Sequence, residues 1–317
     1  MRNQALLALS LLAMVFVSGC IGQPPTPTGK GLAIKSFAPD FSEVRSGERV
    51  TLSSLVENLG EADATGVKAQ LFGLNFVGEW KIKDTNIEPI RSIGTGSSIL
   101  RKADTALGIA GENYEFTWNV QSPADMRVDN TYTANMRVYY KYNTYSTSIL
   151  HFASYDYLRS LTSEQFNKEK SAAGVTSSVY SKAPVSVKLS GGSRPFVVYA
   201  ESGSSDTFSV QIEINNIDTG NAFNKSAPYP SIASGDLHKV NVTVNSHDLD
   251  LDCSNTLDSK SAGWVTLTKG TTKTLFCTAT VLRDKIGNSI DYTVNVDLDY
   301  GYYVDSATKI TVLKKAQ

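Results

Sequence analysis

The segment "YTANMRVYYKYNTY" (132–145) decides the fold, because a related segment, "YTVNVDLDYGYYVD" (292–305), follows later in the chain. The matched residues lie 160 positions apart: Tyr132, Thr133, Asn135, Val138, Tyr140 and Tyr142 against Tyr292, Thr293, Asn295, Leu298, Tyr300 and Tyr302. Phe116 and Phe276 have the same separation. An internal repeat of this length predicts a duplicated architecture.

Both copies have the pattern of β-strands. In 132–142 the even-numbered residues are apolar or aromatic, and most residues between them are polar. Similar alternation occurs in 207–215 and 240–244. A period of two over short runs, with turn residues between, is typical of half-buried strands. About seven such strands in each copy predict an antiparallel sandwich.

The predicted fold is therefore all-β, with two tandem Ig-like antiparallel β-sandwich domains at 32–154 and 183–317. The segment 155–182 between them is rich in charged and polar residues, and we expect it to be a linker. A short helix is predicted from Thr162 to Ala172. Thr162 is a suitable N-cap, and Gln165 follows it at the spacing of a capping box.

A second parallel lies near the start of each copy. It joins "RSGERVTLSSLVENLGEADATGVKAQL" (45–71) to "ESGSSDTFSVQIEINNIDTGNAF" (201–223), where Asn58 corresponds to Asn215 or Asn216. The second copy carries about 15 additional residues there, including "NKSAPYPSIASGD". The Ser-Gly turn, the strand ending in Asn and the bend into "GVKAQL" resemble a CARDB-type Ig-like domain of prokaryotic cell surfaces. That resemblance implies an adhesive or structural sandwich without a family active site.

The first residues have the form of an export signal. Residues 6–17 are apolar except for Ser10, a run too short to span a membrane but of the length of a signal-peptide core. An ordinary signal peptide with an incidental cysteine is one reading. The other is that "VSGC" (17–20) resembles the lipobox of bacterial and archaeal lipoproteins, which implies cleavage after residue 19 and lipidation of Cys20.

This reading places the protein on the extracytoplasmic face of the cell membrane. Residues 1–19 are then the signal peptide, and 20–31 form the lipidated cysteine with a Pro/Thr-rich spacer. Acyl chains gain about 0.8 kcal/mol for each buried methylene group, so two or more chains hold a domain firmly on a bilayer. The expected partners are the membrane, through this anchor, and a surface protein or glycan.

The remaining cysteines, Cys253 and Cys277, are expected to form a disulfide. Strand phase places both side chains on apolar faces, beside Leu251 and Leu275 respectively. A pair of cysteines outside the cell is typically oxidised. A reactive thiol pair is the alternative.

The same phase places Asp248, Asp250 and Asp252 on the outer face of their strand. Carboxylates at two-residue steps are a weak candidate for a calcium site. The favoured interpretation is a charged outer face or edge that resists edge-to-edge pairing. No other metal site is predicted.

Two further pairs of residues are candidate sites. Asn224 (N-K-S) and Asn241 (N-V-T) are glycosylation sequons. Tyr132 and Tyr292 each begin a late strand, a position suited to a tyrosine corner, whose hydroxyl bonds to nearby backbone. Plain core packing of these tyrosines is the other interpretation.

Nothing in the sequence indicates catalysis. His151, His238 and His247 are the only histidines, and none has a metal-ligand partner at a recognised spacing. Nucleophile-elbow, zinc-protease and P-loop motifs are absent. We therefore predict that the protein is not an enzyme, has no catalytic residues and needs no cofactor. With 30 Lys+Arg against 31 Asp+Glu, no basic excess favours nucleic acid.

The function predicted from these features is that of a membrane-anchored extracellular lipoprotein. It acts as a non-catalytic binding, adhesion or structural module through its duplicated Ig-like domains. The alternative is an accessory or docking subunit of a surface machine, such as a transporter or a filament. An extracellular hydrolase is the third candidate.

Overall fold

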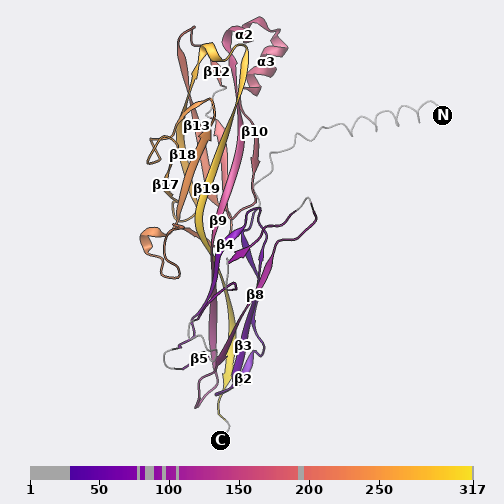
Figure 1. The fold of residues 1–317 in the computed structure, drawn as a ribbon, viewed down its shortest axis with the longest axis vertical. Coiled ribbons are helices and arrows are strands. Elements are labelled where there is room, and N and C mark those ends of the chain that lie inside the picture. Colours follow the sequence, from indigo (N-terminus) through magenta and orange to yellow (C-terminus); the bar gives the residue numbers. More distant parts are fainter. Residues whose placement is uncertain are drawn as a thin grey trace, which may run out of the picture.

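The structure is a computed structural model that describes residues 29–76, 79–82, 89–94, 98–104, 107–191 and 196–315. It confirms the all-β prediction. The molecule is elongated, with two short helices at one end and the C-terminal end of the chain at the other (Figure 1). The described residues form one large central sheet, mostly antiparallel, and two smaller antiparallel sheets.

The central sheet runs the length of the molecule. Its main path is, in order, β17 (Ala262–Thr266), β15 (Lys239–Ser246), β19 (Ser289–Leu313), β9 (Asn130–Ser154), β4 (Ala64–Phe72) and β6 (Ile90–Ser92). Short strands extend it: β10 (Gly174–Tyr180) and β12 (Val197–Val198) pair with β9, β14 (Asn221–Phe223) and β2 (Glu43–Arg45) with β19, and β7 (Ile99–Leu100) with β4.

Each smaller sheet has four strands and comes from one copy of the repeat. The first has the order β1 (Leu32–Pro39), β3 (Arg49–Asn58), β8 (Asn113–Gln121) and β5 (Lys81–Ile82). The second has the order β11 (Val185–Gly191), β13 (Ser205–Asn216), β18 (Thr272–Leu282) and β16 (Asp250–Asp252). The first lies in the half of the molecule that ends at the C-terminus, and the second in the half that carries the helices (Figure 1).

The central strands β9 and β19 are each 25 residues long. In β9 every even-numbered residue from Ala134 to Ser154 is buried. One inward face therefore continues from the first half into the second. The alternation that predicted a strand over 132–142 extends 12 residues further than expected, because no turn interrupts it.

The ladder between β9 and β19 has two-fold symmetry. Its register runs from Asn130 opposite Val312 to Ala153 opposite Ser289, and Lys141 faces Gly301. Lys141 and Gly301 are also 160 positions apart, so they are equivalent residues of the two copies. The pseudo-two-fold axis therefore passes between them, and we call the region around it the waist.

The two halves share these strands, and a division into two consecutive domains is not confirmed. The last residues of β19 pair with β2, in parallel. Ile310 and Val312, near the end of the chain, are fully buried in the half that contains the first small sheet. Conversely, the second part of β9 lies in the other half, where Phe152 contacts Phe196 and Phe208.

The helix predicted in the linker is confirmed. It is α3 (Ser163–Ala172), with Thr162 as N-cap and a capping box completed by Gln165. A shorter helix, α2 (Tyr155–Ser160), precedes it and was not predicted. The linker also supplies β10, which pairs with the second part of β9. Two 3₁₀ turns lie at Ser234–Asp236 and Arg283–Lys285.

The additional residues of the second copy form an insert, 224–238, between β14 and β15. The first copy has only a register shift between Thr65 and Lys68 at the matching point of β4. β4 faces the stretch of β9 from Asn135 to Lys141, and β14 and β15 face the equivalent part of β19. The prediction of an enlarged second copy is therefore confirmed.

The predicted match of Phe116 with Phe276 in the repeat is wrong by one residue. Ser54 faces Phe116 in the first copy, whereas Ile212 faces Leu275 in the second. Because Asn58 matches Asn216, Ser54 matches Ile212, and Leu275 is the counterpart of Phe116. Phe116 is buried, but Phe276 points outward and is 50% exposed.

Candidate functional site

The inner side of the waist is a cluster of four buried tyrosines. Tyr140 and Tyr142 of β9 are the counterparts of Tyr300 and Tyr302 of β19, and their rings contact one another across the axis. The hydroxyl of Tyr140 accepts a hydrogen bond from the Leu32 amide at 3.1 Å, and that of Tyr142 accepts one from the Ala62 amide at 3.1 Å. These hydroxyls tie the start of β1 and the bend after β3 to the central strand β9.

The second copy repeats this arrangement with differences. The Tyr300 hydroxyl accepts a bond from the Val185 amide at 3.4 Å and shares another with Thr144 at 2.8 Å. The Tyr302 hydroxyl donates to the Asn216 side chain at 2.7 Å. Burial raises the pKa of all four tyrosines, to about 12 for Tyr142. The cluster holds neutral phenols in the core and offers no nucleophile.

Two asparagines brace the strand ends beside these tyrosines. The side-chain amide of Asn58 donates to the carbonyl oxygens of Ala62 and Leu100, at 2.8 and 2.9 Å. In the second copy the amide of Asn216 donates to the Gly220 carbonyl at 2.8 Å. In both copies the asparagine side chain thus donates to the carbonyl oxygen of the residue four positions later. From the sequence, either Asn215 or Asn216 could be the counterpart of Asn58, and the structure identifies Asn216.

The outer side of the waist is covered by the insert. Tyr139 and Tyr303, which strand phase places outward, are buried with Phe223, and the half-buried Tyr229 of the insert packs against them. Tyr139 stacks on Tyr229 at 5.5 Å, and the Tyr229 hydroxyl donates to the Gly66 carbonyl at 2.6 Å. A side chain at Gly66 would collide with that hydroxyl. The insert of the second copy therefore locks onto the first copy.

An ion pair flanks the same cluster. The Arg137 guanidinium donates two hydrogen bonds to the Asp305 carboxylate, at 2.6 and 2.7 Å. It also lies 3.9 Å from the centre of the Tyr303 ring. The hydrogen bond to Asp305 raises the pKa of Arg137. Lys225 of the insert pairs with Asp299 at the rim of an open pocket of about 370 Å³ that also includes Lys141.

His151 is the one histidine with two carboxylate contacts in the described part of the chain. Its Nδ1 lies 2.6 Å from Asp291, and its Nε2 lies 3.3 Å from Glu169. The ring thus links β9 and β19 to α3. Neither nitrogen faces a hydroxyl or thiol, so this arrangement lacks the nucleophile of a catalytic triad. We assign it to holding the helix against the sheet.

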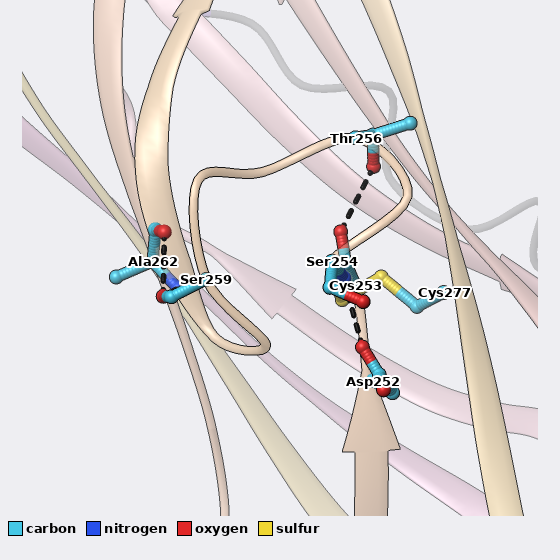
Figure 2. Close-up of a disulfide and its surroundings, with 7 residues drawn as sticks. All are labelled: Asp252, Cys253, Ser254, Thr256, Ser259, Ala262 and Cys277. Atoms are coloured by element: carbon cyan, nitrogen blue, oxygen red, sulfur yellow. Dashed lines mark hydrogen bonds between the residues drawn. A yellow bond between two sulfur atoms is a disulfide. The ribbon is translucent and has the colours of Figure 1, made fainter.

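The disulfide between Cys253 and Cys277 is confirmed and joins the end of β16 to β18. Figure 2 shows the loop that follows Cys253, with Thr256 bonded to the Cys253 carbonyl and Ser254 to the Asp252 side chain. Both cysteines are buried, in agreement with the expected strand phase. The bond fixes an edge strand of only three residues.

Loss of the disulfide is expected to lower the free energy of unfolding by about 3 kcal/mol. The bond closes a loop between cysteines 24 positions apart, and without it the unfolded chain regains the conformational entropy of that loop. The test is urea unfolding of a double variant, Cys253→Ala with Cys277→Ala. Asn255→Ala, an exposed change in the same loop, is the control. An equal midpoint for the double variant and the native chain would contradict a stabilising role.

The aspartates of this edge do not converge as a cation site. Asp250 and Asp252 each lie 3.7 Å from the same Lys260 ammonium group, and Asp252 also accepts a bond from the Ser254 amide. Hydrogen bonding from the side chain and the amide of Ser254 lowers the pKa of Asp252, and the charge of Lys260 lowers it further. Asp248 is exposed, outside this contact. In the described ranges no group of three or more His, Cys, Asp or Glu side chains is arranged to hold a metal ion.

One sequon begins the insert at Asn224, and the other, at Asn241, lies on β15, which follows the insert. The Asn224 amide donates to Asp236 at 3.0 Å, and its oxygen accepts a bond from the Ser226 amide. Asn241 lies on β15 opposite Asp299, on the face away from the buried Val240 and Val242. Asn224 is therefore engaged in holding the insert, whereas Asn241 lies within a strand that pairs with β17 and β19.

The remaining predicted residues are placed as follows. Tyr132 contacts Trp80 edge-on, and its hydroxyl lies 3.7 Å from the Met126 sulfur rather than on backbone. Tyr292 is buried against Phe152. Core packing therefore describes both tyrosines. Cys20 and residues 1–19 lie outside the described residues. None of the helices described is long and apolar enough to cross a membrane.

Comparisons with known proteins do not assign the chain to a family. No family model matches the chain, and no curated protein matches it. Among solved structures, the Enterococcus faecalis MSCRAMM ACE, described as binding its ligands by the collagen hug model, is 7% identical, with 89% of this chain and 95% of that chain covered and a TM-score of 0.15. The CupB6 tip adhesin from Pseudomonas aeruginosa is 9% identical, with 91% and 97% covered and a TM-score of 0.15. Similarities this low carry no argument about fold or function.

Proposed function

We propose that the protein is a lipid-anchored, non-catalytic rod that serves binding or adhesion on the outer side of the cell membrane. The observation that carries this proposal is the continuous β9–β19 ladder. A strand of 25 residues spans roughly 80 Å at about 3.3 Å per residue. Because both strands pass through both halves, bending at the waist would break their pairing. A stiff rod suits a module that holds a surface at a fixed position.

The place where the described chain begins supports an anchor near the middle of the rod. Gly29 lies against the backbone of Ala183, and Gly31 against Tyr140, both at the waist. Eight residues separate Cys20 from Gly29, and an extended chain of that length reaches roughly 30 Å. A lipid on Cys20 would therefore hold the waist close to the bilayer and leave both ends of the rod free to make contacts.

Cys20→Ser is expected to abolish lipid attachment, because only the cysteine sulfur accepts the lipid in this type of anchor. The measurement is the intact mass of the mature chain, together with its release from washed membranes. Ser10→Ala, in the same apolar segment, is the control and is expected to remain anchored. A mature chain that starts at another residue, or carries no added lipid mass, would contradict the proposal.

The binding role is tested separately, by covalent cross-linking on intact cells followed by mass spectrometry. Contacts to several envelope components that disappear in the Cys20→Ser variant would support a surface module. A single dominant partner in fixed stoichiometry would make the protein a dedicated subunit of that partner's assembly. Turnover of an envelope polymer by the purified chain would contradict a non-catalytic role.

A further inference from the structure

The helical end of the rod carries an exposed pair of aromatic rings. Tyr155, the first residue of α2, lies against Tyr199, with ring centres 4.8 Å apart. Tyr199 is 62% exposed, and the Arg159 guanidinium lies 5.8 Å from the centre of the Tyr155 ring. Among the ring pairs in the described ranges, this is the pair with an exposed member. Phe41, Tyr145 and Phe276 are also exposed, but within the described residues none of them contacts another ring.

A polar pocket of about 360 Å³ is built from residues next to these tyrosines in the chain. It is lined by Asp156, Ser202, Arg283, Asp284 and Gly287. Asp156 follows Tyr155 directly, and Ser202 is three residues after Tyr199. Its volume lies within the range of small-molecule sites.

The groups of this pocket are fixed in position. Arg283 bridges Asp156, at 3.1 Å, and the Gly287 carbonyl, at 3.3 Å. Asp284 accepts bonds from the Ser202 hydroxyl at 2.7 Å and the Gly203 amide at 2.9 Å. These bonds lower the pKa of Asp284, so its carboxylate remains an acceptor near neutral pH.

The backbone beneath Tyr199 is also held. The amides of Tyr199 and Ala200 both donate to the Asp206 carboxylate, at 2.5 and 2.9 Å. The ring is therefore presented from an ordered segment although most of its surface is exposed. Ordering before binding lowers the entropy lost on association.

Aromatic faces combined with fixed carboxylates and a guanidinium match the chemistry of a sugar. The C–H face of a pyranose ring packs on an aromatic ring, while its hydroxyls donate to carboxylates and accept from arginine. A protein hot spot would instead need a larger apolar anchor and a desolvated centre. The pocket's polar lining favours the smaller, hydroxylated ligand.

We infer that the helical end of the rod is a carbohydrate-binding site, with Tyr199 and Tyr155 as the stacking platform and Asp156, Arg283 and Asp284 as the hydroxyl-binding groups. The site lies in the half of the rod away from the C-terminus (Figure 1). It goes beyond the proposed anchoring function, since glycan binding and attachment through Cys20 are separate properties and fail separately.

The test uses the full chain purified in a detergent without a sugar head group. It is applied to an array of neutral and acidic oligosaccharides, and the strongest ligand is then measured by titration calorimetry. Tyr199→Ala is expected to weaken binding at least about tenfold, whereas Tyr199→Phe keeps the ring and binds as the native chain does. Asp156→Asn is expected to weaken binding too, because one hydroxyl-binding carboxylate is lost.

Phe276→Ala is the matched control, because it removes an exposed ring of the same half from outside the site. Equal thermal midpoints for the variants would show that the fold is intact. No glycan bound by the native chain would overturn the inference. Equal losses for Tyr199→Ala and Phe276→Ala would also overturn it, as would a protein ligand recovered at this end in place of a sugar.

Discussion

Replacing Ile310 by alanine is expected to lower the free energy of unfolding by about 2–5 kcal/mol, the usual cost of removing a fully buried isoleucine. Ile310 is followed by seven residues in the sequence and lies opposite Tyr132 in the ladder. Its side chain belongs to the core beneath the first small sheet, although it is encoded in the second copy of the repeat. The substitution therefore tests whether the halves share their strands.

The readout is urea unfolding combined with amide hydrogen exchange. Lys309→Ala, the exposed neighbour on the same strand, is the control and is expected to change stability by less than about 0.5 kcal/mol. In Ile310→Ala, protection is expected to fall both in β8, of the first half, and in β18, of the second. Reduced protection in β8 alone would mean that the halves unfold independently, contrary to the shared ladder.

Much of the fold follows from period-two alternation and from the repeat. The inward face of β9 was predictable from Tyr132 to Tyr142, since burial and pattern coincide there. The helix was predictable because Thr162 and Gln165 form a local capping box that needs no distant partner. The disulfide followed from strand phase, because both cysteines share a face with buried leucines.

The exchange of strands between halves was not predictable in this way. Alternation identifies the buried face of a strand but not the strand that pairs with it, so the first copy was expected to end at residue 154. Tyr139 shows the same limit. Its phase is outward, yet it is 3% exposed because the insert, some 90 residues later in the chain, covers it.

The candidate sites were predictable only where they depend on local sequence. The sequons and Cys20 are short motifs, but the contacts of His151 join it to Glu169 and Asp291, which no spacing rule links. The pairing of Tyr155 with Tyr199 likewise depends on how β12 and α2 meet at the end of the rod. Such sites arise from the tertiary fold.

The stability of the protein is expected to fall steeply above pH 10, because of the tyrosines at the waist. Burial raises the pKa of Tyr142 to about 12 and raises those of Tyr140, Tyr300 and Tyr302 well above their usual value. Below pH 10 these phenols are neutral in both the folded and the unfolded chain, and the stabilisation is fully present. Above pH 10 the unfolded chain releases protons that the folded chain retains, so unfolding becomes more favourable.

Each tyrosine held neutral contributes a loss of about 1.4 kcal/mol for each pH unit in its window. For Tyr142 that window runs from about 10 to about 12, where the folded protein also begins to ionise. Tyr140, Tyr300 and Tyr302, whose pKa values burial also raises, each add to this loss. Urea unfolding at pH 8, 9, 10 and 11 measures the slope directly.

Tyr142→Phe separates the phenol from the rest of the waist. At pH 8 it is expected to destabilise the protein by about 1–3 kcal/mol, because the buried Ala62 amide loses its acceptor. Above pH 10 the free energy of unfolding of this variant is expected to fall less steeply than that of the native chain. The difference in slope is about 1.4 kcal/mol per pH unit, the contribution of one tyrosine. Tyr145→Phe, on the exposed side of the same strand, is the control. A native chain whose free energy of unfolding is constant from pH 8 to 11 would contradict this prediction. It would mean that water reaches the tyrosine hydroxyls in the folded protein, so that the waist is not a desolvated contact between the two copies.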